Sequence, residues 1–382
     1  MNYSGPVRTG RVGVGELTAL LTIYTATDVF LSYPSRVAKE SAESGWMIPL
    51  VSGVIVLAVF LIINACMKRF PDENILDVAR QELTVFVSVP LGIIFMLLFF
   101  SQTALVMREF TETVITTVLP RTPSTVVALL FMAVVYYFAY KGIEGLSRLA
   151  MLLSAILGIG LLSLLIMPLT WFDVHLLQPF WGRGMLTTIF YGGTNTSMFL
   201  NVLLLSLLYP TVRNQRQFVR VGVISIGLTA VLMSLVLIVF IGVFPAAPTG
   251  QVPFPMYQLA RLIYIGRFVQ RLESVFVFLW TAAAVLKMGL GLWMTAYLYA
   301  STFKMPLYRP LLPAIALALY VVSFLPPDFP SVQLISANIF EPYGWTVSIA
   351  LPVVIAVVLY LRSGRAQGNH SKRRIARAAR AN

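Results

Sequence analysis

Cysteine and histidine are almost absent from this sequence. Its 382 residues include one cysteine and two histidines. Cys66 has no partner for an internal disulfide, and His175 and His370 lie far apart in polar segments, so they cannot form a cluster of metal ligands. These scarcities exclude a disulfide-stabilised domain and a zinc site. We expect no metal and no cofactor, and we interpret Cys66 as a small apolar residue near a helix end.

Charged residues are also scarce. They make up 11% of the chain, against about 25% in a typical soluble domain. Hydrophobic residues make up 58%, the mean hydropathy is +0.83, and the apolar residues form blocks of about 20, the length that crosses a bilayer. The composition therefore predicts an all-α polytopic membrane protein. We expect no cleavable signal peptide, because the polar N-terminus leads directly into a segment that carries Glu16 and Asp28.

Acidic residues are fewer than basic ones, 15 against 28, which gives a net charge of +13. In a membrane protein such an excess usually marks the cytoplasmic loops, and its distribution favours cytoplasmic termini at residues 1–12 and 362–382. We expect the basic tail to be disordered or to lie against anionic lipid. We do not expect nucleic acid as a partner. The sequence lacks a phosphate-binding glycine loop, a zinc motif and a nucleophile with a histidine partner, so we do not predict an enzyme.

Between these ends, residues 13–361 form one predicted transmembrane domain. Its apolar segments predict ten spans, at Gly13–Ser35, Trp46–Met67, Val85–Leu119, Ser124–Tyr140, Leu146–Leu169, Leu186–Tyr209, Val219–Phe244, Glu273–Thr302, Leu311–Leu325 and Trp345–Leu361. The third and eighth are long enough to tilt or to project beyond the bilayer. Asp72-Glu73-Asn74 should start a short helix before the third span, and the amphipathic run Met256–Ile265 precedes the eighth.

Two spans contain a stretch that is a poor continuous helix. In the sixth, Gly192-Gly193-Thr194-Asn195 places two glycines beside residues that compete for backbone hydrogen bonds. In the first, Tyr24-Thr25-Ala26-Thr27-Asp28 repeats part of this pattern. The match pairs Tyr24 with Tyr191, Thr27 with Thr194, and Asp28 with Asn195. Non-helical backbone persists at membrane depth only where protein or a watery cavity covers it, so a broken span indicates a binding site.

The segments follow the same order in residues 13–169 and 186–361: a broken span, a second span, a surface helix and a very long span. Because each half holds five spans, an odd number, the second copy must be inverted relative to the first. Inverted five-span repeats with broken first helices form one known transporter architecture, the leucine-transporter-type fold, whose site lies at the midplane between the repeats. We therefore predict a 5+5 inverted repeat with broken helices 1 and 6.

Asp28 and Lys287 are the charges best placed to act in such a site. A carboxylate near the bilayer centre costs about 3 kcal/mol unless it is paired or hydrated, and Asp28 lies at a helix break. Lys287 is too deep in the eighth span to reach a membrane surface easily, so it should face the interior and contact freed carbonyls or Asp28 itself. Lys287 would replace a bound sodium ion, carry a proton, or form a purely structural ion pair. Asp28 would bind a ligand ammonium group or a cation, pair with a protein cation, or lie solvated in an outer vestibule.

Neutral polar groups complete the predicted site. The amides of Gly192 and Gly193 would be free at the start of the following half-helix, whose dipole suits a ligand carboxylate. With Asp28 or carbonyls for an ammonium group, the two breaks can accommodate a zwitterion. The predicted binding residues are Tyr24, Thr25, Thr27, Asp28, Ser101, Gln102, Tyr191, Gly192, Gly193, Thr194 and Asn195, with Lys287 as coupling residue or cation mimic. The alternative is that these residues repair helix kinks or serve in helix packing.

Several stretches of Gly13–Arg362 resemble one family in their order and spacing. They are Leu31-Ser-Tyr-Pro-Ser-Arg36, Lys68-Arg-Phe-Pro71, Val106-Met-Arg-Glu-Phe110, Tyr140-Lys-Gly-Ile-Glu144 with Ser147-Arg148, Val285-Leu-Lys-Met288, Arg309-Pro-Leu-Leu-Pro313 and Phe324-Leu-Pro-Pro-Asp328. The chain resembles the spore germination permease subunits, which are the membrane B-subunits of nutrient germinant receptors, in the amino acid–polyamine–organocation transporter superfamily. The family usually has a glycine-rich break in the first span, where this chain reads Thr25-Ala-Thr-Asp28.

This resemblance implies a ten-span bundle in the inner membrane of a dormant spore, which recognises a small nutrient, often an amino acid, beside two partner subunits. Three functions remain open. The first is a receptor that signals germination when nutrient binding shifts the bundle. The second is a proton-coupled amino-acid transporter that uses the same cavity, and the third is a scaffold that has lost ligand binding and only holds partners.

Overall fold

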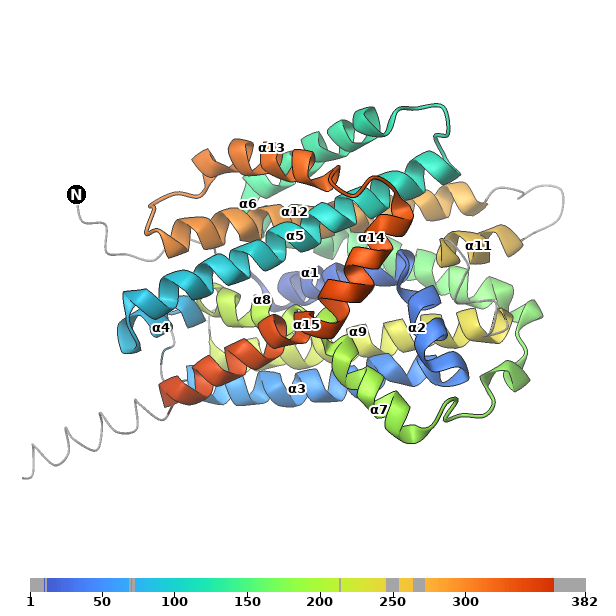
Figure 1. Ribbon diagram of the computed structural model, residues 1–382, viewed down its shortest axis with the longest axis horizontal. Coiled ribbons are helices and arrows are strands. Elements are labelled where there is room, and N and C mark those ends of the chain that lie inside the picture. The colour runs from blue at the N-terminus through green and yellow to red at the C-terminus, as the bar shows by residue number, and fades with distance from the viewer. Residues whose placement is uncertain are drawn as a thin grey trace, which may run out of the picture.

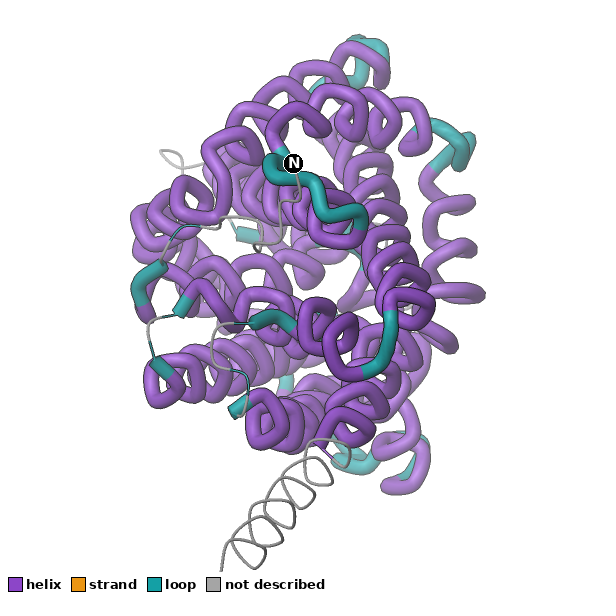
Figure 2. Tube along the Cα trace, turned by 90° about the vertical axis from the view of Figure 1, so that its left-hand side faces the viewer, coloured by secondary structure: helices purple, strands orange, loops and turns teal. Residues whose placement is uncertain are grey.

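The chain folds into a bundle of helices. The computed structural model describes residues 10, 12–68, 70, 73–212, 214–244, 254–263 and 272–360, and this part contains no strand (Figure 2). Most helices lie along the long axis of the molecule (Figure 1). α1 (Val14–Ala26) runs inside the bundle, where Leu17, Leu20 and Leu21 are fully buried. The predicted tail at 362–382 lies outside the described residues, as does most of the predicted N-terminal segment.

Six stretches of the described chain are long and apolar enough to cross a membrane. They are Tyr33–Met67, Val85–Thr117, Ser124–Trp171, Gln215–Val243, Phe276–Thr302 and Phe329–Tyr360. Large apolar side chains cover the outside of the bundle, among them Phe86 at 91% exposure and Val54 at 70%. Such a surface suits lipid rather than water, so the chain is a multi-pass membrane protein.

The first predicted span is broken, as the sequence indicates. After α1 the chain forms a 3-10 turn, Thr27–Phe30, and then a second short helix, α2 (Tyr33–Ser41). The hydroxyl of Thr27 donates to the carbonyl of Ile23 at 2.5 Å, a local bond that competes with the helix ladder. α3 (Ile48–Met67) then returns beside α9 (Gln215–Val243).

The fourth and fifth predicted spans are the two halves of α6 (Ser124–Ile166). At Gly142 the backbone leaves the helical region, with φ 76° and ψ −173°, a conformation that favours glycine. Before this turn, the ring centroid of Phe131 lies 4.5 Å from that of Phe110, and Phe110 contacts Trp280 of α12 (Leu272–Thr302). After this turn, Gly160 lies against Leu279, the residue next to Trp280. Both halves therefore reach the same level of α12, and the second runs back beside the first.

The sixth predicted span is also broken, but later than expected. α7 (Met185–Thr194) includes both Gly192 and Gly193 in its last turns, and α8 starts only at Asn201 (Asn201–Leu208). The prediction that the glycine amides lie free at the start of the second half-helix is therefore wrong. The break is Asn195–Leu200, which begins with a 3-10 turn.

Both predicted surface helices are present. α4 (Ile75–Glu82) is capped by Asn74, whose side-chain oxygen accepts the Leu76 amide at 2.9 Å, and α11 (Pro255–Leu262) precedes α12. Arg80 of α4 donates to the carbonyls of Ser301 and Thr302 at 3.3 and 2.6 Å. These bonds cap the carbonyl end of α12, the helix that carries Lys287.

The remaining spans complete the bundle. The third predicted span is α5 (Val85–Thr117), and α13 (Leu312–Ser323) corresponds to the ninth. The tenth starts earlier than its predicted first residue, Trp345, because Asp328 caps a helix at Phe329 by accepting the Ser331 amide at 2.9 Å. It continues through α14 (Phe329–Ile335) and α15 (Glu341–Trp345), with π-helical turns at Ser336–Phe340 and Thr346–Ala350, and crosses the face of the bundle obliquely in Figure 1. The count of ten crossings and the inverted relation of the halves remain predictions.

Candidate functional site

A buried ion pair lies at the first break. The ammonium nitrogen of Lys287 is 2.5 Å from Oδ1 of Asp28, and the two side chains are 8% and 14% exposed. The same nitrogen lies 4.9 Å from the centroid of the Tyr24 ring, which adds a cation–π contact. The prediction that Lys287 faces the interior and can reach Asp28 is confirmed. Each charge depends on the other, because a buried charge without a partner is strongly destabilising.

A small cavity adjoins this pair. Its volume is about 30 Å³, enough for on the order of two water molecules. The residues that line it come from the first break and α2, from α5, from the second break and from the last helix: Asp28, Leu31, Ser32, Tyr33, Arg36, Gln102, Leu105, Val106, Glu109, Met198 and Ser336. The two interrupted segments therefore border one cavity. Ligand pockets usually measure about 300–1,000 Å³, so this one is too small for such a ligand.

The amino end of α2 faces the cavity and is covered by a carboxylate. Oε1 of Glu109 accepts the backbone N–H of Ser32 at 2.9 Å, and Glu109 is only 7% exposed. One turn into α2, the guanidinium of Arg36 lies 5.3 Å from the Tyr33 ring centroid. With Asp28 and Lys287, the site holds two carboxylates and two cations. This arrangement can bind a ligand that carries both signs of charge.

Glu109 was not among the predicted site residues. Its neighbour Arg108 pairs with Glu112 at 2.9 Å and donates to the carbonyl of Pro327 at 2.5 Å, so the two adjacent charges act on different neighbours. A signal was present in the sequence, because Arg108 and Glu109 are consecutive charges within an apolar span. The sequence does not show how deeply Glu109 lies in the bundle.

The predicted residues of the second break mostly end α7 and do not line the cavity. The hydroxyl of Thr194 and the amide of Asn195 both donate to the carbonyl of Tyr191 at 3.1 Å. Asn195 also donates to Glu40 of α2 at 3.2 Å. The carbonyl of Gly192 accepts from Ser52 of α3 at 2.7 Å, and Gly193 faces open space. From this break, Met198 lines the cavity.

The other predicted residues divide between the cavity and the helix packing. Gln102 lines the cavity, whereas the hydroxyl of Ser101 donates to the carbonyl of Leu97 in its own helix at 2.6 Å. Thr25 donates to the side-chain oxygen of Asn201, the first residue of α8, and thereby links the two broken spans. Asn201 is completely buried and was missed, although it is an isolated amide within an apolar run.

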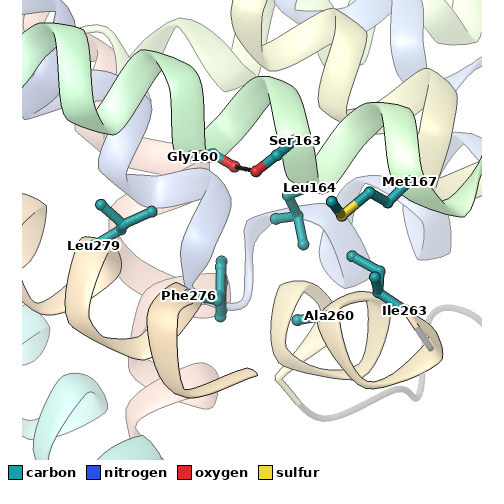
Figure 3. Close-up of a pocket in the computed structure, with 8 residues that line it drawn as sticks. All are labelled: Gly160, Ser163, Leu164, Met167, Ala260, Ile263, Phe276 and Leu279. Atoms are coloured by element: carbon teal, nitrogen blue, oxygen red, sulfur yellow. Dashed lines mark hydrogen bonds between the residues drawn. The ribbon is translucent and has the colours of Figure 1, made fainter. Parts of the chain in front are cut away.

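A second small cavity offers no comparable chemistry. It measures about 30 Å³ and lies between the second half of α6, α11 and α12 (Figure 3). Leu164, Ile263 and Phe276 are among its apolar lining residues. The hydroxyl of Ser163 is used within α6, where it donates to the Gly160 carbonyl at 2.8 Å. We interpret this space as a packing defect.

Sequence comparison identifies the family. Residues 11–332 match the family described as "Spore germination protein". The chain belongs to this family. Spore germination protein KB of Bacillus subtilis (strain 168) is 24% identical over 298 residues, which are 77% of this chain and 79% of that protein. The resemblance found in the sequence is therefore confirmed for this spore germination protein.

Two solved transporters show the fold of this spore germination protein. MHP1, a nucleobase-cation-symport-1 family transporter solved in a closed conformation with bromovinylhydantoin bound, matches with a TM-score of 0.63 and 13% identity over 95% of this chain and 93% of its own. MhsT in complex with L-phenylalanine matches with a TM-score of 0.60 and 12% identity, over 93% of this chain and 99% of the MhsT chain. The fold is thus that of the predicted class of transporters. Family and fold are those of germination proteins and transporters, not of enzymes.

Proposed function

We propose that this spore germination protein is the membrane subunit of a nutrient germinant receptor. It binds a small nutrient in the cavity beside Asp28 and Lys287 and passes a signal to other receptor subunits. The observation that carries this proposal is the cavity itself, where the two broken spans meet charges of both signs. Its place is the inner membrane of the spore, with both termini in the cytoplasm.

An amino acid suits the charges around the cavity. The ammonium group has Asp28 as its carboxylate partner. The carboxylate has Arg36 and the amino end of α2, where the backbone amides and the helix dipole favour an anion. One transporter with the same fold, MhsT, was solved with L-phenylalanine, which supports this class of ligand.

The size of the cavity links binding to a change of shape. A volume of about 30 Å³ cannot admit an amino acid, so the walls must separate before one binds. The walls include α2, α5 and the helix that starts at Phe329, and a ligand that stabilises the separated arrangement shifts the bundle toward it. Such a shift provides the signal that partner subunits detect.

A proton-coupled amino-acid transporter is the second candidate. The observation that favours it is Lys287, a buried cation paired with a cavity carboxylate. A lysine in this position can exchange its proton as the cavity opens to water. The fold relationship to a cation symporter agrees with this alternative.

Purified protein and reconstituted vesicles distinguish these functions. An amino acid that raises the melting temperature without entering vesicles supports the receptor, whereas proton-linked uptake of the radiolabelled compound supports transport. If neither effect is observed, the protein acts as a scaffold that only holds its partners.

Gln102→Ala should reduce the rise in melting temperature that the amino acid causes, because Gln102 lines the cavity. Ser101→Ala is the matched control, since its hydroxyl is used within α5.

A further inference from the structure

A basic cavity that opens at the protein surface lies at one end of the bundle, away from the site above. It measures about 460 Å³ and is lined by Lys68, which follows α3, and by Gln215, Arg216, Val219 and Arg220 of the first turns of α9. α3 and α9 pack side by side near this end, where the rings of Phe60 and Phe218 are 5.4 Å apart. Three cations from two helices therefore share one space.

The described residues supply no acidic partner to these cations. Within the part of the chain that the structure describes, no ion pair joins Lys68, Arg216 or Arg220 to a carboxylate. Like charges held close together repel one another, so an anion that binds between them is stabilised by all three. The cavity thus has the charge of an anion-binding site.

A separate feature of the same cavity favours an anion with oxygen acceptors. The side-chain nitrogen of Gln215 is buried and has no hydrogen-bond partner among the described residues. A buried donor without an acceptor is unfavourable, and an anion in the cavity supplies one. Gln215 is also the first residue of α9, a 29-residue helix whose amino end has positive dipole character.

The surroundings distinguish a lipid from a free ion. α3 and α9 are apolar helices, and the exposed side chains that follow the cavity along α9 are Val223 and Ile224, at 39% and 48% exposure. On α3, Leu61 and Ile62 are similarly exposed. An acyl chain can lie along these residues while its headgroup phosphate reaches the cavity.

We propose that this cavity binds the phosphate group of an anionic phospholipid. The lipid comes from the leaflet at the end of the bundle where α3 ends and α9 begins, and its acyl chains lie along the exposed faces of these helices. This site does not depend on nutrient binding between the broken spans.

The test counts bound lipids by native mass spectrometry on the full-length protein in detergent. The protein is titrated with phosphatidylglycerol, with phosphatidylcholine, and with inorganic phosphate as competitor. Replacing both Arg216→Gln and Arg220→Gln should lower the apparent affinity for phosphatidylglycerol about thirty-fold. Arg148→Gln is the matched control, because Arg148 is exposed and does not line the cavity. All variants should elute from gel filtration as the wild type does, since these side chains are exposed.

The results of these titrations distinguish a bound anionic lipid from a diffuse basic surface and from free phosphate. Selective loss of phosphatidylglycerol in the double variant, with wild-type binding in Arg148→Gln, supports the lipid site. Equal losses in the double variant and in Arg148→Gln would show a diffuse basic surface and overturn the proposal. Competition by inorganic phosphate at a concentration equal to that of the lipid would establish a phosphate site but overturn the lipid as its occupant.

Discussion

At the scale of single residues, the ion pair of Asp28 and Lys287 dominates the centre of the protein. Both were predictable, because a charge inside an apolar span is costly and therefore conspicuous in the sequence. Glu109 is also a charge in an apolar span, but it was missed because that span extends over Val85–Thr117 and a position in a long helix does not reveal its depth. The same limit applied to Asn201, whose importance follows from its bond with Thr25.

Removing one partner of the ion pair should be worse than removing both. Lys287→Met leaves Asp28 as a buried, uncompensated carboxylate, which should lower the free energy of unfolding by about 3–5 kcal/mol. Adding Asp28→Asn should recover part of this loss, because no unpaired charge remains. Denaturant unfolding of the two single variants and the double variant measures the coupling. A double variant that loses the sum of the single losses would show that the charges do not interact.

Glu109→Gln should strengthen the binding of a nutrient that carries a carboxylate. The amide oxygen can still accept the Ser32 N–H, but the negative charge at the amino end of α2 is gone. Affinity should rise about threefold to tenfold, the range expected for one charge at a helix end. Binding titrations with an amino acid that stabilises the wild type provide the measurement. Weaker binding would instead identify Glu109 as a direct partner of the ligand.

At the scale of helices, the sequence indicated which spans break but misplaced one break. Gly192 and Gly193 are weak helix formers, yet both remain helical because α7 packs on α3, where Ser52 binds the Gly192 carbonyl. The helix ends where Thr194, Asn195 and Thr196 turn their side chains onto preceding carbonyls. Such competition depends on side-chain orientation, which composition alone does not specify.

The two glycines of α7 should respond oppositely to alanine. A Cβ at Gly192 would lie 2.5 Å from a methyl carbon of Val51, so Gly192→Ala should destabilise the protein by about 1–3 kcal/mol. A Cβ at Gly193 meets nothing within 4 Å, and Gly193→Ala should stabilise the helix by about 0.5–1 kcal/mol. Melting temperatures of both variants test this, and a decrease of equal size in both would contradict it.

The surface helix α4 gives a prediction about pH. Burial is the main cause that raises the pKa of Asp77 from 3.8 to about 6, and the negative charge of Glu73 adds to it. Because the folded pKa lies above the unfolded value, the stability contributed by protonated Asp77 is lost as pH rises from about 4 to above 6. At pH ~7.5, Asp77→Asn should therefore raise the free energy of unfolding by on the order of 2–3 kcal/mol, which is observed as a higher melting temperature. At pH ~4 the substitution should have little effect. A gain of the same size at both pH values would exclude this cause.

At the scale of the whole molecule, the family and the fold were predictable, while the state of the site was not. Apolar blocks, broken spans and the order of the family stretches suffice for the architecture. Whether a midplane cavity is open or closed depends on how α2, α5 and the last helix meet, and each contributes residues far apart in the sequence. Nor does a local sequence motif indicate a ligand, because the residues around the cavity come from distant parts of the chain.

Ligand-induced stabilisation of the wild type and of the variant that combines Lys287→Met with Asp28→Asn tests the central claim most directly. This variant removes both charges without leaving either one unpaired, so it should still fold. A panel of amino acids is screened for compounds that raise the melting temperature of the wild type. An effective compound should leave the melting temperature of the double variant unchanged. An equal rise in both proteins would place the nutrient outside the cavity between the broken spans.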